Sequence, residues 1–182
     1  MSNGSHDLVL FLGQLHPVLV HLPIGGLVLL AILEMLAKFP RFKGLAQNSR
    51  LIIGLLAAAS VTAALLGWML SRAGDYDPQL LPWHKWAGFA VGATCTLTWL
   101  LNCRGRPRAY QISLLATLLV LVVASHLGAS LTHGRDFLTQ FAPGSLRALL
   151  VANGRPPDGP GTRSDLTQQP VFGALVQPIL QR

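Results

Sequence analysis

The sequence predicts an all-α protein: a four-helix transmembrane bundle followed by a mostly irregular C-terminal tail. Of the 182 residues, 51% are hydrophobic and only 12% are charged, whereas soluble domains carry roughly 25% charged residues. The mean hydropathy is +0.48. Four apolar runs almost free of charge follow one another, and three reach or approach the roughly 20 residues that a helix needs to cross a bilayer. They are residues 19–36, 51–70, 86–101 and 112–127.

Local signals refine the first and third runs. Pro17 suits the first turn of a helix, so residues 8–15 are expected to form a short interfacial segment before the span. Pro23 cannot donate a backbone hydrogen bond, and it should loosen the turn that carries His21. The third run is short unless residues 82–85 join the same helix.

One acidic residue lies inside a predicted span. Glu34 comes four residues before Lys38, a spacing that places two side chains on the same helix face. This spacing favours an ion pair at the membrane interface over a proton relay.

Basic residues indicate how the helices are oriented. The connection at 38–50 holds four Lys or Arg and that at 103–110 holds three Arg, whereas residues 71–85 mix two basic with two acidic side chains. Cytoplasmic loops collect Lys and Arg, so both termini should lie on the periplasmic side of a bacterial inner membrane. The net charge of +7 then reflects topology. Lipid is an expected partner and nucleic acid is not.

The chain is expected to divide into four parts. Residues 1–136 form the four-span bundle, and residues 137–153 form an interfacial helical segment. Residues 154–169 are a Pro- and Gly-rich flexible linker, and residues 170–182 resume an amphipathic helical pattern. A helix this short does not fold alone, so we expect the chain to be a truncated version of a longer protein.

Histidines mark one end of the predicted bundle. On the topology above, five of them fall at the periplasmic ends of three spans: His16, His21, His84, His126 and His133. Polar groups are costly in lipid and usually face the interior of a bundle. The cluster therefore indicates a cofactor or metal site. Hydrogen bonding between helices at the interface is the alternative.

Small residues accompany these histidines. Gly88, Gly92 and Cys95 continue the helix face of His84, and Gly25 follows His21 by one turn. Small residues leave room for a flat macrocycle or for close approach of another backbone. Ordinary packing of small residues between helices explains the pattern equally well.

Depth along the helices suggests which histidines act as ligands. His21 and His126 are the deeper residues on their spans, so they are the expected axial ligands of haem b iron. His84 and His133 would serve a second haem or a quinol hydroxyl, and His16 is the remaining member of the cluster. Copper or zinc held by the same imidazoles, or a non-catalytic membrane anchor, are alternative functions.

Four motifs carry a family resemblance. They are "LHPVLVHLPIG", "GWMLSRAGDYD", "WHKWAG" and "HLGASLTHGRDF", and they resemble the successive motifs of a bacterial family of four-helix membrane domains of unknown function. The resemblance covers about residues 8–140 and includes all five histidines. It departs from the family pattern at Ala129, where a glycine is expected. It implies a bundle similar to b-type cytochromes.

The same family is often fused to planctomycete-type cytochrome c domains. The terminal "PVFGALVQPILQR" is similar to the helix that precedes the haem attachment motif in those domains. Because the histidines gather only at the periplasmic end, we expect the protein to pass electrons between the quinone pool and a periplasmic cytochrome c domain or another redox subunit.

Two helix ends also resemble one another. "GWMLSRAGDY" and "GASLTHGRDF" align Gly67 with Gly128 and Leu70 with Leu131. The alignment hints at duplicated helical hairpins.

The predicted orientation is open to a reporter experiment. A periplasm-active enzyme fused after Arg182 should be active, because both termini are expected outside, and the same enzyme inserted within residues 38–50 should be inactive. Activity of the two fusions in a bacterial host is the measurement. The reverse pattern contradicts the orientation.

Overall fold

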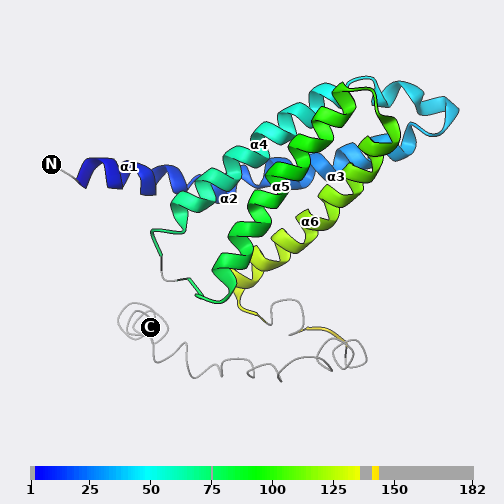
Figure 1. Cartoon of the computed structure of the whole chain (residues 1–182). Helices are drawn as coiled ribbons and strands as arrows, with labels where there is room; N and C mark the ends of the chain where they lie inside the picture. The colour runs from blue at the N-terminus through cyan, green and yellow to red at the C-terminus, as the bar shows by residue number, and fades with distance from the viewer. Residues whose placement is uncertain (1–2, 75, 136–140, 144–182) are drawn as a thin grey trace, which may run out of the picture. The chain divides into compact units, whose positions relative to one another are not determined.

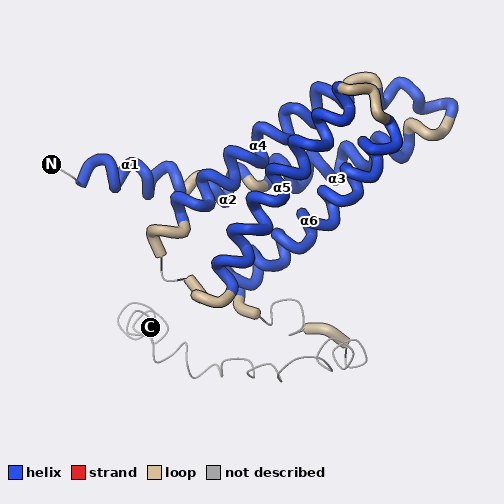
Figure 2. Tube along the Cα trace, viewed as in Figure 1, coloured by secondary structure: helices blue, strands red, loops and turns tan. Residues whose placement is uncertain are grey.

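Every regular element in the part of the chain that the structure describes is a helix. A computed structural model describes residues 3–74, 76–135 and 141–143. Figures 1 and 2 show the helices, which are α1 (Asn3–Gly13), α2 (His16–Leu19), α3 (His21–Leu36), the 3₁₀-helix η1 (Pro40–Ala46), α4 (Ser49–Leu70), α5 (Leu80–Cys103) and α6 (Pro107–His133). The all-α prediction is confirmed for these residues.

The chain divides into two units, Met1–Thr132 and His133–Arg182. Apart from 141–143, the predicted interfacial segment, the linker and the terminal helix lie outside the described residues. The description below therefore concerns the first unit.

Three stretches are long and apolar enough to cross a membrane: Asp7–Leu36, Ser49–Leu70 and Pro107–His133. They correspond to three of the four predicted spans. Helix α5 matches them in length, with 24 residues, and it begins at Leu80, so residues 82–85 do join it. Its glycines, threonines and tryptophans, together with Lys85, make it less apolar than the other three.

The first stretch is interrupted where its prolines predict. Pro17 lies in the first turn of α2, and turns at residues 14–15 and 20 separate α1, α2 and α3. Pro23 has no N–H to donate to the carbonyl of Leu19. The helical pattern is restored when Ile24 donates to the Val20 carbonyl at 3.2 Å.

One hydrophobic core joins α3, α4, α5 and α6. Its buried members are Leu27, Leu30, Ile53, Leu56, Ala57, Val91, Cys95, Tyr110, Leu114, Leu121 and Ala124. The outer surface is also apolar: leucines such as Leu51 and Leu119 are more than 60% exposed. An apolar exterior is typical of a protein whose solvent is lipid.

Between α5 and α6, buried hydroxyl groups pack beside the apolar core residues. Thr98 Oγ1 on α5 lies 2.8 Å from Ser113 Oγ and 3.1 Å from Thr117 Oγ1, both on α6. Side-chain hydrogen bonds of this kind connect helices where no water competes. They fix α5 against α6.

The acidic residue of the first span connects α3 to α6. The Tyr110 hydroxyl donates to Glu34 Oε1 at 2.8 Å. The predicted ion pair with Lys38 is wrong, because within the described chain the Glu34 carboxylate turns toward Tyr110 instead. Spacing along one helix could not reveal a partner on another helix.

The pattern of buried residues repeats along the chain. Each buried residue of α3 has a buried counterpart 68 positions later on α5: Pro23 and Val91, Leu27 and Cys95, Leu30 and Thr98. All buried residues of α4 except Ala57 have a buried counterpart 61 positions later on α6: Ser49 and Tyr110, Ile53 and Leu114, Leu56 and Thr117, Ser60 and Leu121, Ala63 and Ala124. The chain thus contains two copies of one packing pattern, as the aligned helix ends suggested. We call them the two hairpins: the first consists of α2, α3 and α4, and the second consists of α5 and α6.

The hydroxyl contacts between α5 and α6 generate a stability prediction. Thr98→Val should lower the free energy of unfolding by about 1 kcal/mol, because it removes hydrogen bonds between two helices at an apolar site. Thr62→Val is the matched control, since the Thr62 hydroxyl is exposed and bonds only within its own helix. Reversible unfolding of the full chain in detergent micelles is the measurement. Equal losses in both variants contradict the assignment.

Candidate functional site

Two of the five histidines lie together. His16 is the first residue of α2, and His84 lies in the first turns of α5. Their ring centroids are 6.3 Å apart and the rings are inclined by 77°. Both side chains are half-buried. Helices from the two hairpins thus bring two imidazoles to one point.

A backbone carbonyl of another helix in the same hairpin holds each imidazole. His16 Nδ1 lies 2.8 Å from the Ala63 carbonyl oxygen on α4, and His84 Nδ1 lies 3.1 Å from the Ala124 carbonyl oxygen on α6. A carbonyl only accepts, so Nδ1 carries the proton and donates in both cases. In a neutral imidazole the other nitrogen, Nε2, then has a free lone pair. The structure therefore presents two Nε2 atoms as acceptors or metal ligands.

Glycine permits each of these contacts. Gly67 follows Ala63 by one turn, and a Cβ at Gly67 would lie 2.7 Å from His16 Cε1. Gly128 follows Ala124 by one turn, and a Cβ there would lie 2.9 Å from His84 Cε1. Any side chain at either position would collide with the imidazole ring. The histidine reaches the helix backbone only because glycine leaves that face open.

The two halves of this arrangement are equivalent in the repeat. His16 and His84 are 68 positions apart, the same offset that relates the buried residues of α3 and α5. Ala63 and Ala124, like Gly67 and Gly128, are 61 positions apart, as are the buried residues of α4 and α6. We call these six residues the histidine site. Each hairpin contributes one His, one Ala and one Gly.

The structure places the other predicted ligands elsewhere. His21 and His126 are exposed, and neither has a hydrogen bond or ring contact among the described residues. His133 is the last residue of α6 and is exposed; it belongs to the second unit. His21 and His126 thus do not contact each other, and their predicted ligation of haem stays a prediction.

Helix geometry explains this placement. An α-helix turns by about 100° per residue. Five residues therefore place His21 roughly 140° around the axis from His16, and two residues place His126 roughly 200° from the buried Ala124. Depth along the membrane sorts side chains by level, whereas the direction around the helix decides which ones meet.

The glycines divide in a similar way. Cβ atoms at Gly25 and Gly88 would meet nothing within 4 Å, so these two glycines are not required by packing against a histidine. Gly67 and Gly128 are required. The signal that pointed to them was the alignment of the two helix ends.

The donor set at the histidine site is two imidazoles. Within the described residues, no group of three or more His, Cys, Asp or Glu side chains is arranged to hold a metal ion. Any group bound here would therefore take two ligands from this site.

Residues 13–142 match the model of a family described as predicted membrane proteins, DUF2231. The chain belongs to this family. The matched segment contains both hairpins and all six residues of the histidine site. No curated protein and no solved structure matches the chain.

The glycine contacts generate a second stability prediction. Gly67→Ala and Gly128→Ala should each destabilise the protein by about 1–3 kcal/mol, since an added methyl overlaps an imidazole ring. Gly25→Ala and Gly88→Ala are matched controls in open space, and alanine there should be neutral or stabilising by up to about 1 kcal/mol. Reversible unfolding of the full chain in detergent micelles again measures the change in the free energy of unfolding. Losses at the control sites as large as at Gly67 contradict the argument.

Proposed function

We propose that this protein is a four-span membrane electron-transfer protein that binds haem b between its two hairpins, with His16 and His84 as the axial ligands. The observation that carries the proposal is the pair of adjacent imidazoles, each fixed through Nδ1 by a backbone carbonyl. His16 and His84 take the place of His21 and His126, which the sequence favoured.

A four-helix bundle with α5 as the fourth span follows from packing and length. Helix α5 contributes Val91 and Cys95 to the core that it shares with the three apolar stretches. Its 24 residues extend about 36 Å at 1.5 Å per residue, and the hydrocarbon layer is roughly 30 Å thick. Its glycines and threonines are buried or half-buried against neighbouring helices, whereas its tryptophans are exposed.

The separation of the imidazoles fits one metal ion between them. A metal–imidazole bond of about 2.0–2.1 Å places the ion roughly 3 Å from the ring centroid. One ion held by both rings therefore requires ring centroids no more than about 6 Å apart. The observed separation is 6.3 Å.

The number of ligands favours haem over zinc or copper held by protein alone. Structural zinc takes four protein ligands in tetrahedral geometry, and the histidine site supplies two. The macrocycle of haem provides the remaining nitrogens, so two axial imidazoles complete its coordination. Haem b would supply reversible one-electron chemistry.

The residues around the imidazoles perform the supporting roles. The Nδ1–H bonds to Ala63 and Ala124 hold the rings in one orientation, as hydrogen bonds to metal-binding histidines do. Gly67 and Gly128 allow those bonds to form. A histidine fixed in this way needs little reorganisation when it binds.

The position of the site suggests the electron partners. It lies at the ends of the helices opposite the basic connections, which the positive-inside rule assigns to the cytoplasm. The site then faces the periplasm of the bacterial inner membrane. We assign the quinone pool as the donor and a periplasmic cytochrome c domain or other redox subunit as the acceptor.

Optical spectroscopy tests the ligand assignment. The full chain, expressed with haem supplied and purified in detergent, should show the reduced spectrum of low-spin b-type haem. His16→Gly and His84→Gly should each abolish that spectrum, because one axial ligand is lost. Added imidazole should restore it, since the free molecule replaces the missing ligand.

His21→Gly and His126→Gly are the matched controls, and both should keep the wild-type spectrum. Loss of the spectrum in these controls, with retention in the other two variants, would return the assignment to His21 and His126. If the wild-type protein takes up copper or zinc but no haem, that metal replaces haem as the assigned cofactor. If the purified wild-type protein contains neither haem nor metal, the remaining function is that of a non-catalytic membrane anchor.

A further inference from the structure

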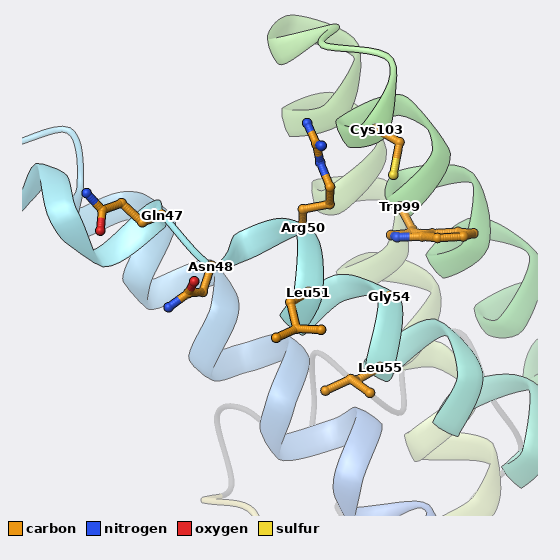
Figure 3. A pocket seen from close by; sticks show the side chains of 8 residues that line it. All are labelled: Gln47, Asn48, Arg50, Leu51, Gly54, Leu55, Trp99 and Cys103. Atoms are coloured by element: carbon orange, nitrogen blue, oxygen red, sulfur yellow. The ribbon is translucent and has the colours of Figure 1, made fainter.

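A groove lies between α4 and α5 at the end of the molecule opposite the histidine site. Its volume is about 510 Å³. Figure 3 shows its lining residues, which come from the start of α4, the two residues before it and the end of α5: Gln47, Asn48, Arg50, Leu51, Gly54, Leu55, Trp99 and Cys103. Neither the proposed function nor the family assigns this groove a role.

The lining changes from polar to apolar along the groove. Gln47 and Asn48 precede α4 and Arg50 lies in its first turn, whereas Leu51 and Leu55 continue along it. The indole of Trp99 lies against Gly54, where a Cβ would be 2.9 Å from Trp99 Nε1. An aromatic side chain with a polar edge is typical of the headgroup level of a membrane.

The surroundings of the groove carry one sign of charge. The connections at 38–50 and 103–110 together contain seven Lys or Arg and no Asp or Glu. Arg50 is the member of this set that lines the groove. Basic pockets between membrane helices on the cytoplasmic side attract anionic lipid headgroups.

The repeat shows that these features are not required by the fold. At the equivalent positions of the other hairpin interface, Gln111 replaces Arg50, Leu115 replaces Gly54 and Ala31 replaces Trp99. The same helix packing is thus achieved without the charge and without the glycine–tryptophan pair. Only the interface between α4 and α5 carries both among the described helices.

We propose that the groove binds one anionic phospholipid. The Arg50 guanidinium contacts the phosphate, and the amides of Gln47 and Asn48 provide further hydrogen-bond donors. An acyl chain lies along Leu51, Leu55 and the Trp99 ring. This inference is independent of haem binding.

Fluorescence quenching by brominated lipids tests the proposal. Trp68, Trp83 and Trp86 are each at least 38% exposed and lie outside the groove, so replacing all three with Phe leaves Trp99 as the only tryptophan. In phosphatidylcholine nanodiscs, brominated phosphatidylglycerol should quench Trp99 more strongly than brominated phosphatidylcholine at the same mole fraction. Arg50→Gln should reduce this lipid preference about fivefold, the effect of one basic side chain near an anionic headgroup.

Arg41→Gln is the matched control, because Arg41 belongs to the same basic connection and lies outside the groove; it should keep the preference. Equal quenching by the two lipids, or equal loss in both arginine variants, overturns the proposal. Displacement of the lipid effect by inorganic phosphate would indicate a simple anion site and also overturns it. The lipid that co-purifies with the wild-type chain and with Arg50→Gln gives a second readout, and an unchanged phosphatidylglycerol content counts against the groove.

Discussion

The contact between a histidine ring and a helix backbone is the constraint on which the rest of the structure depends. For His16 Nδ1 to reach the Ala63 carbonyl at 2.8 Å, the next turn of α4 must present no side chain, and Gly67 meets that condition. The bond fixes the tautomer and joins α2 to α4. The same set of constraints recurs between α5 and α6, so each hairpin carries its own anchored imidazole.

Hydrogen bonds between polar side chains connect the helices inside this protein, whereas its exterior is apolar. Buried hydroxyls connect α5 to α6, and the Tyr110–Glu34 hydrogen bond connects α6 to α3. In lipid, burying more leucine gains little, since hydrocarbon chains are as apolar as the side chains themselves. Specific hydrogen bonds and close backbone contacts therefore decide which helices pair, and the histidine site is the most elaborate of these contacts.

Hydropathy predicted the helices well because a span is a local property of about 20 residues. It also located the end at which the histidines gather. It did not identify the pair that meets, because depth carries no information about direction around a helix, and His21 therefore seemed better placed than His16. Nor did it indicate Ala63 or Ala124, which act through backbone carbonyls and leave no side-chain signal. Glu34 was misassigned for a similar reason, since its partner lies 76 residues away.

Divergence between the hairpins separates what folding requires from what the histidine site requires. Among the eight pairs of equivalent buried residues, only Ala63 and Ala124 are identical. At the opposite end, Glu34 corresponds to Asn102 and Ser49 corresponds to Tyr110; Tyr110 reaches Glu34, whereas the buried Ser49 Oγ has no hydrogen-bond partner in the described chain. Packing alone thus tolerates wide substitution. The histidine site nevertheless keeps His, Ala and Gly in both copies, because each ring donates to a backbone carbonyl and needs a glycine one turn further on to leave room for it.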